Sequence, residues 1–137
     1  MGTFTQKYPN FSSKTVGGKQ LFQLTRDDEL PEDVPGHEVT IYSLSKTGER
    51  NILKKDLEAE IARRINLVHG DFRQKDILVR WQEVFENSKN ESFQIISCTL
   101  SCSSGTYVRQ LVADIGKRIG IPLVTHSISR TRVGEYK

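Results

Sequence analysis

With 36% hydrophobic and 27% charged residues among 137, the chain has the composition of one ordinary globular domain, not of a disordered segment. No run approaches the roughly 18 apolar residues of a membrane span, and the start lacks a signal-peptide core, so a cytoplasmic protein is expected. The formal net charge of +3 permits a nucleic-acid partner without requiring one. Two cysteines, Cys98 and Cys102, are too few for a disulfide scaffold or a zinc site and are interpreted as small buried residues.

The first part of the chain predicts one short helix and one strand within irregular segments. Pro9 and the pair Gly17-Gly18 are turn signals. In chain order, the prediction is an irregular segment at residues 3–18, a short helix within 19–28, a proline-containing loop at 27–36 and a strand, HEVTIYSLS, at 37–45.

Two helical patterns follow. Apolar residues recur at helical spacing from Leu53 to Val68, and Gly70 then supplies a stop signal. Asp71, followed three residues later by Gln74, has the form of a capping box. Helical spacing then continues over residues 77–85, where a strand is the alternative.

The last part contains a strand-to-helix joint, SCSSGTYVRQL, at residues 101–111. Residues 93–100 read as a strand, and apolar spacing from Val108 to Ile119 predicts a helix that ends at Gly120. One or two short strands are expected after it. The whole order predicts an α+β fold with a mixed, mostly antiparallel sheet.

The joint itself has features of an anion site. Ser103 or Ser104 could cap the helix, and backbone N–H groups in such a turn can bind an anion; a capped joint that binds nothing is the alternative. Tyr107 and Arg109 fall about 100° to either side of Val108 in the first turn. A cation is unfavourable at the positive end of a helix, so Arg109 needs a carboxylate or phosphate partner unless it is simply exposed to solvent.

Histidines and basic residues are less specific signals. His37, His69 and His126 lack metal-ligand spacing and are interpreted as surface or satisfied core residues. Basic residues interleaved with aromatic ones concentrate near both ends of the chain, which suits RNA, although ordinary solvated charge is the alternative. The candidates are Lys14, Lys19, Phe22 and Arg26 near the start and Arg130 and Arg132 near the end.

Two separated stretches resemble the TruB family of tRNA pseudouridine synthases. QKYPNFSSKTVGGKQLFQLTR, residues 6–26, is similar to Q-x-P-P-x-Y-S-A-x-K-x-x-G-K-x-L-Y-x-x-A-R. CSSGTYVRQLVADIGKRIGIPLVTHSISRTRVGEY, residues 102–136, is similar to C-S-x-G-T-Y-I-R-x-L-x-x-D-I-G-x-x-L-G followed by L-x-R-T-x-V-G-x-F. With TIYSL at 40–44, the resemblance covers about half of the chain.

The resemblance implies part of a pseudouridine synthase catalytic fold that isomerises a T-loop uridine of tRNA without cofactor or metal. Tyr107 would contact the flipped-out uridine, Arg109 would pair with the catalytic aspartate, and Ile128 would replace an active-site leucine. The first stretch would be a thumb that grips the T-arm, and Lys14, Lys19, Phe22, Arg26, Arg130 and Arg132 would contact RNA.

The chain also departs from the family pattern. Phe11 replaces the thumb tyrosine, Thr15 stands where the pattern has lysine, and residues 50–88 look like a helical insertion. The motif G-x-x-D-P, which carries the catalytic aspartate, is absent, so the isolated chain is expected to be inactive. The expected organisation is one partial catalytic domain: a thumb-like segment at 3–30, the insertion, and an active-site strand-helix-strand unit at 93–137.

Two other functions remain open at this point. One is an RNA-binding module of the same ancestry without chemistry, and the other is a protein-interaction domain built on the inserted helices. A half-domain of this kind would also leave a sheet edge exposed, through which a homodimer could form.

Overall fold

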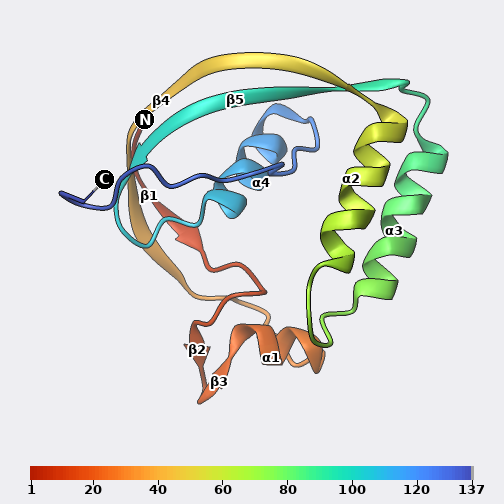
Figure 1. Ribbon diagram of the computed structural model, residues 1–137. Coiled ribbons are helices and arrows are strands. Elements are labelled where there is room, and N and C mark those ends of the chain that lie inside the picture. The colour runs from red at the N-terminus through yellow and green to blue at the C-terminus, as the bar shows by residue number, and fades with distance from the viewer. Residues whose placement is uncertain (137) are drawn as a thin grey trace. The chain divides into compact units, whose positions relative to one another are not determined.

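The computed structural model describes residues 1–136 and confirms the predicted α+β class (Figure 1). Its elements are β1 (Gly2–Lys7), β2 (Thr15–Val16), β3 (Lys19–Gln20), α1 (Leu21–Arg26), β4 (Gly36–Leu53), α2 (Lys54–Asn66), α3 (Gln74–Asn87), β5 (Ser92–Cys102) and α4 (Val108–Ile119). None of the described helices is long and apolar enough to cross a membrane.

The chain divides into two compact units, and the long strands β4 and β5 run through both. The first unit comprises Met1–Ser45 and the residues from Thr99 onward, and the second comprises Lys46–Cys98. The first unit contains the thumb-like segment and the strand-to-helix joint. The second contains the two helices that the sequence predicts between residues 53 and 85.

One three-stranded sheet has the order β1-β4-β5. Strand β1 pairs antiparallel with β4, from Gly2 opposite Ile41 to Lys7 opposite Gly36. The β4–β5 pair is also antiparallel, because Ser103 N donates to Thr40 O at 2.8 Å near one end and Lys54 N donates to Glu91 O at 2.9 Å at the other. The prediction of an irregular segment at residues 3–18 is therefore wrong for residues 3–7, and it is also wrong for the short strand β2 at 15–16. The polar strand β1 is stabilised by its partner and not by its own pattern.

The thumb-like segment has the predicted turn and helix. Gly17 and Gly18 adopt φ angles of 58° and 83°, so they form the tight two-residue connection between β2 and β3, which a side chain at either position would strain. Helix α1 follows directly, and Leu21 and Leu24 are buried. Val39 and Ile41 of β4 and Leu111 of α4 are the other buried apolar side chains described in this unit.

Besides its parts of β4 and β5, the second unit contains a pair of helices joined by a short loop (Figure 1). The strand alternative for residues 77–85 is wrong, because α3 covers all of them. Phe85 is buried and stacks on Trp81, with 5.6 Å between the ring centroids. The predicted capping box is also wrong: the residue before α3 is Arg73, in left-handed conformation with φ of 58°, and it makes no side-chain cap.

The joint leads into α4, which ends at Gly120 with φ of 72° as predicted. The strands expected after α4 are wrong for the residues described, since a single bridge between Val133 and Tyr136 is the regular pairing there. The buried interpretation of the cysteines is wrong for Cys98, which is exposed, and Cys102 is half-buried. The reason is that β5 lies at a sheet edge, where the alternation of side chains along the strand does not show which face is buried.

Candidate functional site

Gln6 holds the strand-to-helix joint against β1. Its Oε1 accepts a hydrogen bond from Tyr107 N at 2.8 Å, and its Nε2 donates to Tyr107 O at 3.1 Å. The residue is 1% exposed, so the side-chain amide pairs with the Tyr107 backbone as a neighbouring strand would. The sequence interpretation missed this role, although Gln6 opens the first family-like stretch.

Ser103 ties the joint to the sheet and does not cap the helix. Ser103 Oγ accepts a hydrogen bond from Thr40 N at 2.9 Å, and Thr106 Oγ1 donates to Ser103 O at 2.8 Å. Tyr107 is the residue before the first turn of α4, and it makes no side-chain cap. The prediction that Ser103 or Ser104 caps α4 is therefore wrong, since the helix begins further along the chain.

Three rings gather at the joint. Tyr8 stacks on His37 with 4.4 Å between centroids, and both rings meet Tyr107 edge-on at 5.9 and 6.0 Å. His37 Nε2 lies 2.9 Å from Gly105 O, so this nitrogen carries the proton and donates it, while the buried Nδ1 has no partner among the described residues. The Tyr8 and His37 rings both contact the Tyr107 ring, and the isolated place of His37 in the sequence did not indicate this contact.

An open cleft of about 480 Å³ lies beside the joint. Its lining residues are Lys7, Tyr8, Pro9, Asn10, Phe11, Glu32, Val34, Arg109, Gln110 and Lys117. Three cations and one carboxylate make the lining positive, and Phe11, which is 52% exposed, adds an aromatic surface. Arg109 is exposed and makes no hydrogen bond or ion pair within residues 1–136. The anionic partner expected from the helix dipole is thus not supplied by the described part of the chain.

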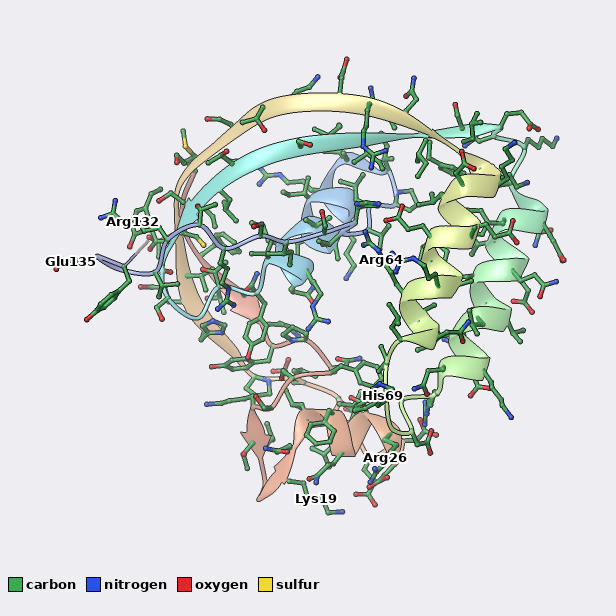
Figure 2. All side chains as sticks on the ribbon, in the orientation of Figure 1. Lys19, Arg26, Arg64, His69, Arg132 and Glu135 are labelled. Atoms are coloured by element: carbon green, nitrogen blue, oxygen red, sulfur yellow. The ribbon has the colours of Figure 1, made fainter. Side chains whose placement is uncertain are left out.

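The RNA-binding candidates of the thumb-like segment differ in the contacts that their side chains make within the chain. Lys14 Nζ lies 5.2 Å from the Tyr8 ring centroid, which connects the thumb-like segment to the three rings. Lys19 donates to Glu29 at 2.6 Å, and this hydrogen bond and the Glu29 charge raise the pKa of Lys19. Arg26 lies 3.3 Å from the Asp27 carboxylate, and Phe22 is half-buried. Figure 2 shows Lys19 and Arg26 among the exposed side chains around α1.

The candidates after α4 lie apart from the cleft lining. Ile128 is half exposed, and neither it nor Arg130 or Arg132 lines the cleft. Arg132 Nε donates to Gly134 O at 2.7 Å within its own turn (Figure 2). The structure therefore places Lys14 and Tyr107 against the same Tyr8 ring, and it brings Arg109 together with Lys7, Phe11 and Lys117 in the cleft lining. Of these, Lys7 is also bound to Asp33 at 2.8 Å, which lowers the pKa of that carboxyl.

Comparisons with known proteins support the resemblance carried by the two motifs. The chain is 28% identical over 135 residues to tRNA pseudouridine synthase B of Lactobacillus gasseri, which covers 98% of this chain and 33% of that protein. The same named protein of Bacillus pumilus is 28% identical, covering 98% of this chain and 31% of its own length. The protein of this name from Listeria monocytogenes is 28% identical over 137 residues, and the match covers 99% of this chain and 33% of that protein.

The matched span covers nearly the whole chain, and the predicted resemblance to the TruB family is confirmed. The chain spans about a third of the length of the curated relatives it matches. No family model matches it.

Proposed function

We propose that this chain supplies the RNA-gripping and arginine-bearing part of a tRNA pseudouridine synthase site that acts on a T-loop uridine. The observation that carries the proposal is the positive cleft in which Arg109, two residues after Tyr107, has no partner among residues 1–136. The relatives' name, tRNA pseudouridine synthase B, supports the same reaction class.

The proposed reaction breaks the bond between the uracil and the ribose, rotates the base and joins it again through carbon. A stacked uridine must first leave its helix, which requires a surface that receives the flipped base. Phe11 offers an exposed ring for stacking, and Lys7 and Lys117 offer positive charge to the phosphates. Arg109 would hold and orient the carboxylate of the family's catalytic aspartate, while Tyr107, positioned by Gln6 and the neighbouring rings, would contact the uridine.

We predict that residues 1–137 alone form no pseudouridine, because the G-x-x-D-P motif is absent from them. The test uses a T-arm stem-loop RNA labelled with tritium at uracil C5, whose release reports isomerisation. An Arg109→Ala variant gives the background. Release from the unchanged chain above that background would contradict the prediction.

Residues 1–137 carry no G-x-x-D-P aspartate, so in this chain Arg109 can meet an RNA phosphate instead. We predict that Arg109→Ala weakens binding of the same stem-loop roughly three- to tenfold and lowers the salt dependence of binding by about 0.7–0.9 in slope, the effect of one phosphate contact. The matched control is Arg118→Ala, which removes the same charge from α4 at an exposed position outside the cleft lining. Fluorescence anisotropy across a salt series measures both. Equal losses in the two variants would show that net charge, not the cleft, sets the affinity.

We predict that Glu29→Gln tightens RNA binding by roughly two- to threefold, because it frees the Lys19 ammonium to meet RNA. The expected gain is small, since an exposed ion pair holds its lysine only weakly against a polyanion. The substitution releases Lys19, whose ammonium Glu29 holds at 2.6 Å. Glu38→Gln, another exposed acid of the first unit, is the control for the change in net charge. Equal RNA affinities for the Glu29→Gln and Glu38→Gln variants would show that Lys19 does not contact RNA.

A non-catalytic RNA-binding module is the second candidate, favoured by the absent aspartate motif. It shares the binding predictions above. The two differ when the missing motif is supplied: isomerisation by this chain mixed with a polypeptide that carries G-x-x-D-P supports the enzyme, and binding without isomerisation supports the module.

A further inference from the structure

The second unit carries its own concentration of positive charge, at the end of the helix pair where α2 connects to α3. We call residues 63–80 the hairpin tip. The tip holds five basic residues and two aspartates, a net charge of +3, which equals the formal net charge of the whole chain. Residues 54–62 and 81–87, the rest of the helix pair, hold two lysines and five acidic residues. Charge is therefore separated along the pair, with the positive end at the loop.

The loop within the tip is organised by Gln74. Its Oε1 accepts a hydrogen bond from Phe72 N at 2.9 Å, and its Nε2 donates to Val68 O at 3.0 Å and to Gly70 O at 2.6 Å. Three hydrogen bonds from one side chain give this short loop a defined backbone course. Gln74 thus orders the loop before α3, a role different from the predicted capping box.

This loop presents one aromatic ring. A Cβ placed at Gly70 would lie 3.1 Å from Phe72 Cε2, so the ring rests closely against the glycine backbone. Phe72 is nevertheless 53% exposed. The ring is supported on one side and open on the other, with Arg63, Lys75 and Arg80 exposed on the flanking helices. Figure 2 shows Arg64 near the end of α2 and His69 in the loop itself.

We propose that the hairpin tip is an RNA-binding surface in which Phe72 stacks on an unpaired base while Arg63, Lys75 and Arg80 meet nearby phosphates. A supported, exposed ring on a tip of net positive charge matches RNA loops, whose splayed bases stack on aromatics beside their phosphates. Exposed Leu67 and Val68 would also suit an apolar partner, and RNA binding that depends on neither Phe72 nor Lys75 would favour that alternative. The inference goes beyond the proposed function, because it requires neither the cleft nor any chemistry.

The experiment compares binding of the full chain to a stem-loop RNA and to a fully paired duplex of the same stem. Phe72→Leu keeps apolar bulk but removes the aromatic face, so we expect roughly tenfold weaker stem-loop binding and unchanged duplex binding. Phe72→Trp, which keeps an aromatic face, should bind the stem-loop about as tightly as the unchanged chain. Equal stem-loop affinities for the unchanged chain and the Phe72→Leu variant would overturn the stacking contact, and so would equal losses on both RNAs.

The charge arm uses two lysines of the same helix pair. Lys75→Gln lies in the tip and should lower the salt slope by about 0.7–0.9, whereas Lys55→Gln, exposed near the opposite end, should not. Equal effects would overturn the inference. Binding to phosphatidylserine vesicles that needs Lys75 while RNA binding does not would also overturn it, in favour of a lipid surface. Arg109→Ala tests the cleft independently, so failure of the proposed function and failure of the tip give different patterns.

Discussion

Gln6→Leu is expected to lower the free energy of unfolding by about 2–4 kcal/mol, because it leaves two backbone groups of Tyr107 without partners. Leucine fills most of the space but can neither accept from Tyr107 N nor donate to Tyr107 O. Gln6 is almost fully buried, so solvent replaces these bonds only if the joint moves. Urea denaturation followed by circular dichroism measures the loss.

The matched control for Gln6 is Gln94→Leu, at an exposed position on β5. Its amide bonds only to the exposed Glu49 side chain, at 3.3 Å, so a change within about 0.5 kcal/mol is expected. Gln6→Leu should also weaken stem-loop binding by the cleft, because the joint that positions Tyr107 and Arg109 loses its attachment to β1. Unfolding free energies that are the same for Gln6→Leu and the unchanged chain would contradict this account of the clamp.

Gly116→Ala is expected to destabilise the first unit by about 2–3 kcal/mol, the upper part of the range for overpacking a close contact. The added Cβ would lie 2.7 Å from Ile121 O and 2.9 Å from Leu123 N, and both are backbone atoms. Gly116 lies within α4, where alanine is otherwise favoured over glycine by roughly 1 kcal/mol. A lower midpoint in thermal or urea unfolding would thus report the close approach of the segment after α4.

Gly120→Ala separates this clash from the cost of backbone conformation. Gly120 has φ of 72°, and a Cβ there would meet nothing within 4 Å. The expected loss is only about 1–2 kcal/mol, from left-handed strain alone. If Gly116→Ala instead raised stability, helix propensity would outweigh the contact, and the packing of residues 121–123 against α4 would have to be revised.

Local sequence signals were sufficient to predict the elements whose backbone hydrogen bonds are formed within the element itself. The helices α2, α3 and α4 follow from apolar spacing over three or more turns, and the left-handed glycines follow from their intrinsic freedom. Strands β4 and β5 contain enough apolar and β-branched residues to be recognised, although β4 extends further than predicted. Strand β1 escaped prediction because its stability comes from hydrogen bonds to β4, which lies about thirty residues away.

The capping predictions failed for a related reason. Ser103 and Gln74 both have side chains that can bond several nearby backbone groups, and sequence alone does not rank those partners. In the structure, Ser103 serves the sheet through Thr40, and Gln74 serves the loop through Val68, Gly70 and Phe72. Several backbone groups near each side chain could have formed these hydrogen bonds, and the tertiary structure determines which of them do.

By itself, the sequence determined the α+β class and the helix pair, since periodicity and glycines are local properties. A dense local motif also led to the prediction that Tyr107 and Arg109 are site residues. Only the tertiary structure decided that Gln6 clamps Tyr107, that His37 and Tyr8 surround its ring, and that Lys7 and Lys117 share a cleft with Arg109. These contacts join residues up to 101 positions apart. Such pairings depend on strand register and helix placement, which no short stretch of the chain encodes.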